Sequence, residues 1–141
     1  MPHNLTFSAL HLYDPGEPGI TLPIGLRCRT GSVDLTVKLD TGASHCIFQR
    51  DYADSLGIDV ETGEEKEFGT ANSKFIAYGH EVIIIAFDLE YQATAYFAKD
   101  YYITRNVLGR QGWLYKVRIG LIDYDGKLYV SHYDDDSDVG F

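Results

Sequence analysis

The stretch Val37 to Phe48, VKLDTGASHCIF, carries the residues of this chain that are best suited to chemistry. At its centre is Asp40-Thr41-Gly42, in which an apolar run delivers one carboxylate to a turn of small residues. Glycine allows a tight turn and close approach by another chain, and the threonine hydroxyl can hydrogen-bond a neighbouring backbone group. This turn would hold a carboxylate at a defined place for acid–base chemistry, although the same three residues also occur in purely structural turns.

The residues before Asp40 predict the strand that positions it. In SVDLTVKLD, apolar side chains alternate with polar ones from Val33 to Leu39, which indicates a strand with one buried face. A second strand is predicted over Ile24 to Arg29. Downstream, Asp51 to Leu56 is predicted to form a short helix that stops at Gly57.

A hairpin is predicted after this helix, with arms Glu67–Thr70 and Lys74–Tyr78 and the tip Ala71-Asn72-Ser73. Further strands are expected over Glu81–Phe87 and Ala93–Ala98. The first of them contains the apolar run VIII, which indicates burial on both faces.

The last strands are predicted in KVRIGLIDYDGKLYV, on either side of the hairpin signal Asp125-Gly126. Together the chain has roughly ten short strands and one or two short helices. The pattern predicts an all-β fold, either a barrel or a sandwich.

Length and composition predict one domain with an acidic tail. The 141 residues fit a single domain over 1–133, with residues 1–23 as an N-terminal extension or strand. Residues 134–141 contain four aspartates and are expected to be disordered. The net charge of −9, from 12 basic and 21 acidic side chains, argues against a nucleic-acid partner.

The sequence also predicts a soluble chain in the cytoplasm. No apolar run approaches the roughly 18 residues of a membrane span, so no membrane partner is expected. The start, MPHNLTFSALHLYDPG, does not read as a secretory signal. Cys28 and Cys46 are then expected to be reduced thiols.

No metal or cofactor is expected. The five histidines show no ligand spacing, and the acidic tail lacks the glycine and glutamate offsets of a calcium loop. His45 lies close to the Asp40 turn, where it either tunes the local electrostatics or is an ordinary loop histidine.

A second motif, Val107-Leu108-Gly109-Arg110, occurs further along the chain. With Leu39-Asp40-Thr41-Gly42-Ala43 it resembles the two motifs of the retropepsins, the single-lobed aspartic proteases of retroviruses and their stand-alone bacterial relatives. The resemblance covers roughly residues 24 to 131. It implies a closed, retropepsin-like acid-protease barrel.

The resemblance further implies an aspartic endopeptidase that acts on peptide or protein substrates as a homodimer. Each subunit would contribute Asp40, Thr41 and Gly42, so that two Asp40 carboxylates face each other. Two such carboxylates share one proton, and the pair activates a water without a covalent intermediate. Only one Asp-Thr-Gly exists in the chain, which agrees with a second copy supplying the other carboxylate.

The remaining site residues are also implied by this resemblance. Substrate would contact the catalytic loop and a flap made by the predicted hairpin, with Ala43, Ser44, Ala71, Asn72 and Ser73 as the contact residues. Val107, Leu108, Gly109 and Arg110 would support the loop from behind. Retroviral relatives usually carry an acid where this chain has Ser44, so Arg110 is expected to find another partner.

Two other functions stay open from the sequence. The same fold could serve as a non-catalytic module that binds a peptide or protein, because fold does not determine function. A structural β domain with an incidental Asp-Thr-Gly is the third reading, and it leaves the second motif unexplained.

Overall fold

The computed structural model describes residues 1–69 and 71–135. Most of the predicted acidic tail, residues 136–141, therefore lies outside the described residues. The strands are β1 Ala9–Leu12, β2 Ile20–Cys28, β3 Gly31–Leu39, β4 Cys46–Phe48, β5 Glu64–Gly69, β6 Lys74–Ala86, β7 Leu89–Ala98, β8 Val107–Leu108, β9 Val117–Ile122 and β10 Lys127–His132. The helix α1 covers Arg50–Leu56, and short 3₁₀ turns cover Val60–Thr62, Leu114–Lys116 and Asp123–Asp125.

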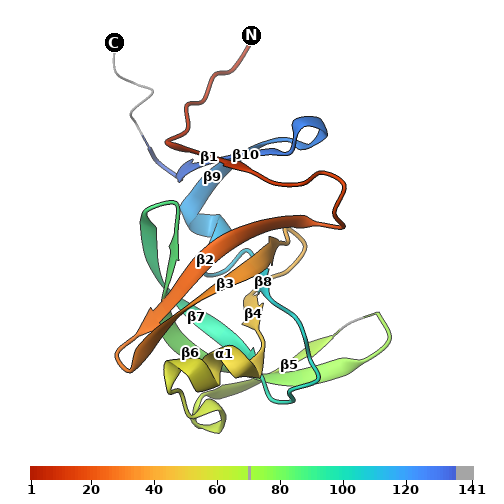
Figure 1. The fold of residues 1–141 in the computed structure, drawn as a ribbon, viewed down its shortest axis with the longest axis vertical. Helices are drawn as coiled ribbons and strands as arrows, with labels where there is room; N and C mark the ends of the chain where they lie inside the picture. Colours follow the sequence, from red (N-terminus) through yellow and green to blue (C-terminus); the bar gives the residue numbers. More distant parts are fainter. Residues whose placement is uncertain (70, 136–141) are drawn as a thin grey trace.

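Six strands close into a barrel. Their order is β2-β3-β8-β4-β7-β6, and pairing of β2 with β6 completes the circle, while β5 extends the wall beyond β6. Figure 1 shows the β5–β6 hairpin projecting from the lower end of the barrel. The predicted all-β closed barrel with few helices is confirmed.

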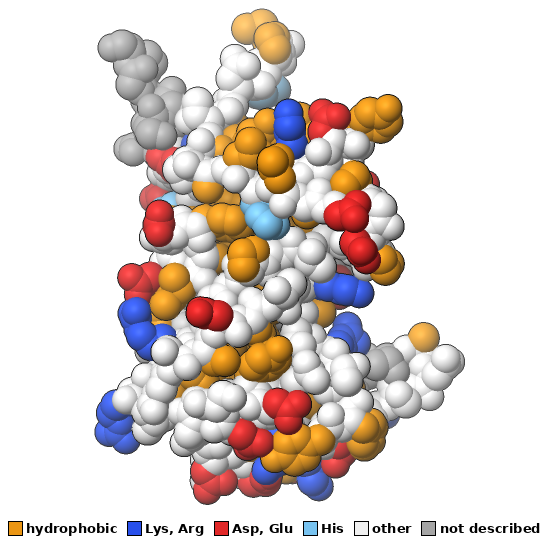
Figure 2. Space-filling view, viewed as in Figure 1, with side chains coloured by type: hydrophobic (Ala, Val, Ile, Leu, Met, Phe, Trp, Pro, Cys, Tyr) orange, Lys and Arg blue, Asp and Glu red, His pale blue; other side chains and the backbone are white. Residues whose placement is uncertain are grey.

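A separate three-stranded sheet joins the two ends of the chain. The N-terminal strand β1 pairs with β10, which pairs with β9. This terminal sheet lies at the upper end of the molecule, and exposed hydrophobic side chains are visible over it in Figure 2. The exposed hydrophobic residues of these three strands include Leu10, Leu12, Leu121 and Ile122. Part of the predicted N-terminal extension is thus a sheet strand.

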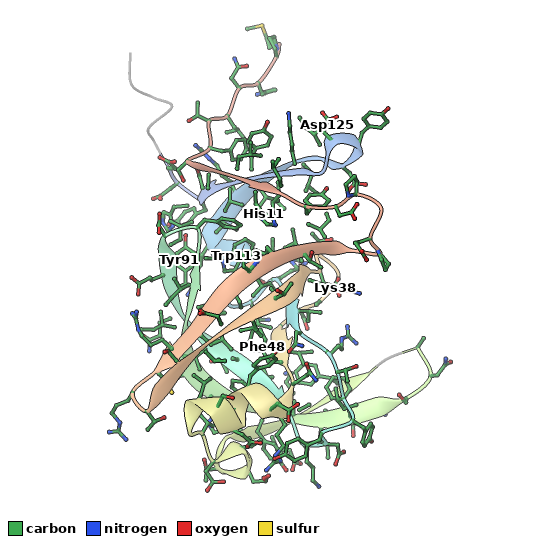
Figure 3. All side chains as sticks on the ribbon, in the orientation of Figure 1. His11, Lys38, Phe48, Tyr91, Trp113 and Asp125 are labelled. Carbon is green, nitrogen blue, oxygen red and sulfur yellow. The ribbon has the colours of Figure 1, made fainter. Side chains whose placement is uncertain are left out.

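The barrel is filled by large apolar side chains. Phe48 and Trp113, both fully buried, lie inside it in Figure 3. The expectation that the apolar run of β6 is buried on both faces is wrong. Val82 and Ile84 are buried, whereas Ile83 and Ile85 are only half-buried. Alternate residues of a strand point to opposite faces, so a single-layered barrel wall fully buries only one set.

Two predicted turns are present in the structure, and the second is built differently from the prediction. The helix α1 ends at Gly57, which has the left-handed φ of 74° that glycine favours. The last hairpin forms, but its turn includes the 3₁₀ segment Asp123–Asp125 before Gly126. No helix in the described part of the chain is long and apolar enough to cross a membrane.

Candidate active site

Asp40 is held at the end of β3 by backbone bonds on both sides. Its N–H donates to the carbonyl of Leu108 at 3.0 Å, which continues the parallel pairing of β3 with β8. Beyond it, the N–H of Gly42 donates to Asp40 Oδ1 at 2.9 Å, and the N–H of Ala43 donates to the Asp40 carbonyl at 3.1 Å. The Asp40 side chain remains 38% exposed. The carboxylate is therefore fixed in position yet open to solvent.

Thr41 contributes less to the turn than expected. It is exposed, and within the described residues its hydroxyl has no hydrogen-bond partner. The carboxylate of Asp40 fixes the turn instead, through its bond from Gly42. An aspartate that accepts a backbone N–H two residues ahead forms a common side-chain-stabilised turn.

The second motif lies directly behind the catalytic loop. The N–H of Arg110 donates to the carbonyl of Ala43 at 2.9 Å, and the N–H of Gln111 donates to the carbonyl of Ser44, also at 2.9 Å. A Cβ atom on Gly109 would lie only 2.3 Å from the carbonyl oxygen of His45. Only glycine allows the two backbones this close, so Gly109 supports the loop through close packing.

The backbone of Arg110 bonds to the catalytic loop, but its side chain contacts a different residue. It is exposed, and its guanidinium lies 5.8 Å from the centre of the Tyr115 ring. Val107 and Leu108 are buried beneath the loop. The second motif thus ties the loop through its backbone, and the Arg110 side chain packs on an aromatic ring.

Arg105 is a charged neighbour of Asp40 that the sequence did not reveal. Its Nη2 lies 3.8 Å from Asp40 Oδ2, and both side chains are 38% exposed. Arg105 precedes β8 and reaches back to the end of β3, since these two strands are parallel neighbours. Its position before the motif, outside any recognised pattern, gave no signal of this contact.

His45, at the end of the catalytic loop, packs against the base of the flap. Its Nδ1 lies 2.7 Å from the Ser44 hydroxyl oxygen, and its ring meets the edges of Phe68 and Tyr96 at centroid distances of 5.6 and 5.2 Å. Burial lowers the pKa of His45, and the charge of Lys66 lowers it further. His45 is therefore an uncharged aromatic contact at neutral pH.

A pocket of about 300 Å³ lies between the loop and the base of the flap. It is lined by Gly42, Ala43, Ser44, His45, Ile47, Lys66, Glu67, Phe68, Gly69 and Arg105. The predicted contact residues Ala43 and Ser44 are thus in one pocket with strand β5. The flap tip, Ala71 to Ser73, is exposed and does not line it.

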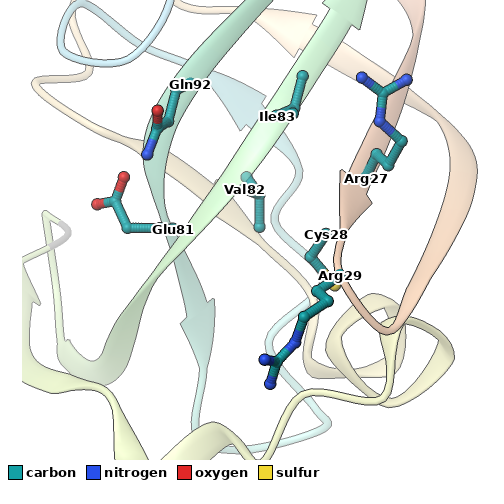
Figure 4. A pocket seen from close by; sticks show the side chains of 7 residues that line it. All are labelled: Arg27, Cys28, Arg29, Glu81, Val82, Ile83 and Gln92. Carbon is teal, nitrogen blue, oxygen red and sulfur yellow. The ribbon is translucent and has the colours of Figure 1, made fainter.

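A larger pocket of about 420 Å³ lies on the outside of the barrel, between β2, β6 and β7 (Figure 4). It contains none of the predicted site residues. Cys28 borders it; burial raises the pKa of this thiol, but hydrogen bonds from Thr30 and Gly31 and the charge of Arg29 together lower the pKa overall. Among residues 1–69 and 71–135, no cluster of three or more His, Cys, Asp or Glu could hold a metal ion.

Comparison with known proteins gives matches of two kinds. Residues 26–90 match the model of a family described as aspartyl protease. The fold is similar to that of the EIAV protease solved with the inhibitor HBY-793, with 19% identity over 70% of this chain and 88% of that one, and a TM-score of 0.54. It is also similar to a retropepsin-like aspartic protease from Rickettsia conorii, with 21% identity over 82% of this chain and 100% of that one, and a TM-score of 0.56.

No curated protein matched the chain. The matched segment contains the Asp40 loop, and the barrel is that of the retropepsins. The chain therefore has the fold of the retropepsins, and its segment 26–90 is similar to the aspartyl protease family. The resemblance found in the sequence is thereby confirmed.

Proposed function

We propose that the chain hydrolyses peptide bonds as a homodimer in which Asp40 of each subunit forms the catalytic pair. The observation that carries this proposal is the Asp40 loop itself. It presents one fixed, solvent-accessible carboxylate on a backbone anchored by Leu108 and Gly109. One carboxylate cannot serve as base and acid in the same step, so a second copy must supply its partner.

The reaction needs no group beyond the two carboxylates and a water. The ionised Asp40 removes a proton from the water, whose oxygen attacks the carbonyl carbon of the peptide bond, while the partner's protonated Asp40 donates to the carbonyl oxygen. The first Asp40 then gives its proton to the nitrogen as the carbon–nitrogen bond breaks, and the partner's Asp40 takes a proton back from a hydroxyl of the intermediate. Because the two carboxylates share a single proton, they titrate as a coupled pair.

The other predicted residues have supporting roles in this proposal. Thr41 and Gly42 shape the turn that carries Asp40, while Ala43 and Ser44 contact the bound peptide. The flap tip Ala71 to Ser73 covers the peptide, because an exposed hairpin tip can close over a ligand. Val107 to Arg110 keep the loop in register.

Replacing Asp40 with asparagine tests the proposal. Asp40→Asn keeps the shape and the acceptor oxygen for Gly42, but it removes the group that carries the proton. We expect cleavage of a mixed peptide library, followed by mass spectrometry, to fall to background, while circular dichroism and the sedimentation coefficient stay unchanged. Full activity in this variant would refute the proposal.

The binding-module alternative has its own signature. A chain that stays monomeric at micromolar concentration in analytical ultracentrifugation, binds peptides and cleaves none would be a binder on the same fold. The pair of Asp40 residues could not form in such a monomer.

A further inference from the structure

The pocket between the catalytic loop and the flap is basic, although the chain as a whole has a net charge of −9. Two of its lining residues are cations, Lys66 and Arg105, and one is an anion, Glu67. Lys66 comes from the flap strand β5, and Arg105 comes from the segment before β8. The two cations therefore reach the same pocket from separate elements.

The single acid of the pocket is already paired. Glu67 Oε1 lies 3.3 Å from Lys74 Nζ on the opposite strand of the flap. Lys66, in contrast, forms no ion pair with any residue in the described ranges. Its charge nevertheless acts inside the pocket, since it lowers the pKa of His45 in addition to the larger effect of burial. Lys66 is thus a cation of the pocket without an ion-pair partner among the described residues.

Arg105 retains donors for a ligand. Its nearest described anion is Asp40, at an Nη2 to Oδ2 distance of 3.8 Å, which is longer than a hydrogen bond. In a catalytic pair that shares one proton, the two Asp40 side chains carry about one negative charge instead of two. Formation of the pair would therefore weaken the one anion that competes for Arg105.

The rest of the lining suits the stem of an acidic side chain. Ile47 is buried and Phe68 is half-buried, and both present apolar surface to the pocket. Apolar walls exclude water and strengthen the attraction between a carboxylate and the cations at its rim. The planar guanidinium of Arg105 matches the geometry of a carboxylate with two parallel donors.

We propose that this pocket selects an acidic side chain, glutamate or aspartate, of the peptide substrate, and that Lys66 and Arg105 are the residues that determine this specificity. The inference rests on the proposed protease function, because it names the substrate class of that same site. The preference for an acidic side chain is local to this pocket, because the net negative charge of the whole chain would repel acidic peptides.

A peptide series in which each position in turn is Glu or Gln tests the preference. Glu and Gln have nearly the same shape, so their ratio of kcat/KM isolates the charge. We expect the Glu peptide to be cleaved about tenfold more efficiently at one position, because charge-assisted hydrogen bonds commonly contribute this factor. Added salt should reduce the ratio.

Variants assign the preference to its residues. Lys66→Gln and Arg105→Gln should each bring the Glu-to-Gln ratio close to one, whereas Arg105→Lys should retain part of it. Lys99→Gln removes an exposed lysine outside the pocket and should leave the ratio unchanged. General damage to the site would lower kcat/KM for both peptides equally, so the ratio separates lost specificity from lost folding.

Binding provides a second readout that does not need cleavage. The same fluorescent Glu and Gln peptides, titrated with the wild-type chain and followed by anisotropy, should show the same preference. If the chain cleaves no peptide but binds Glu better, the proposed protease function fails and the basic pocket stands. If cleavage occurs and no position distinguishes Glu from Gln, or if neither variant changes the ratio, the inference is overturned.

Discussion

The catalytic loop and the flap are both turns between strands, yet the protein holds them in opposite ways. The loop from Asp40 to His45 is fixed by backbone bonds to Leu108, Arg110 and Gln111. The flap is attached at its base, where Phe68 stacks on Phe75 at 5.6 Å, and its tip residues Ala71 to Ser73 are exposed. The loop is thus packed against neighbouring segments, whereas the flap is packed at its base and exposed at its tip.

The difference follows from the work that each turn would do. A catalytic carboxylate must stay in productive geometry, because small displacements cost a large part of the rate. A lid must open and close around its ligand, which requires few buried contacts at its tip. The contrast between a packed loop and an exposed tip can be tested by matched changes.

Gly109→Ala and Gly69→Ala should give the largest contrast. The added methyl on Gly109 meets the carbonyl of His45 at 2.3 Å, whereas nothing lies within 4 Å of the same atom on Gly69. We expect Gly109→Ala to lower the free energy of unfolding by about 3 kcal/mol or more, and Gly69→Ala to change it by less than about 0.5 kcal/mol. Urea unfolding at matched protein concentration measures both. Equal effects would show that the loop is not more tightly packed than the flap.

Thiol labelling should separate the two turns within one molecule. Cys46 borders the loop and is fully buried, and burial raises its pKa to about 11. In a Cys28→Ala, Asn72→Cys double variant, the thiol introduced at the flap tip should react with iodoacetamide at pH 8 at least about a hundredfold faster than Cys46, since the thiolate is the reactive form. Peptide mapping after timed quenching assigns the two rates. Comparable rates would mean that the loop region opens as readily as the flap.

His45 should give the smallest effect, because it joins the two regions by ring contacts. Its pKa is lowered from the ordinary value of 6.5 in the folded chain, first by burial and then by Lys66. The unfolded chain therefore takes up the proton first as the pH falls, so stability is complete above about pH 6.5 and declines below it. His45→Gln should flatten this decline between pH 7 and pH 5 in urea unfolding. If the slope of stability against pH is unchanged in this variant, His45 is not the cause of the decline.

The sequence predicted the elements whose local patterns are strong. The alternation in β3 and the stop at Gly57 locate the strand that carries Asp40 and the helix behind it, because both depend on residues close together in the chain. The resemblance of the two motifs to those of the retropepsins implied the closed barrel. Local pattern could not show which faces of β6 are covered, since that depends on the path of distant strands.

The site was less predictable than the fold for the same reason. The contact of Arg105 with Asp40 depends on the parallel pairing of β3 with β8, which no short pattern encodes. The support from the second motif was expected partly through the Arg110 side chain, but the backbone of Arg110 makes the contact and the side chain packs on Tyr115. In the sequence, close backbone packing is marked only by a glycine, which here is Gly109.

Mixing wild-type chain with Asp40→Asn chain tests the central claim most directly. The two are combined at constant total concentration, allowed to exchange subunits, and assayed for cleavage of one peptide. If each active site needs Asp40 from both copies, activity follows the square of the wild-type fraction, and an equal mixture retains about a quarter of the full rate. A linear decline, with about half of the rate in the equal mixture, would show that one Asp40 is sufficient and would contradict the paired mechanism.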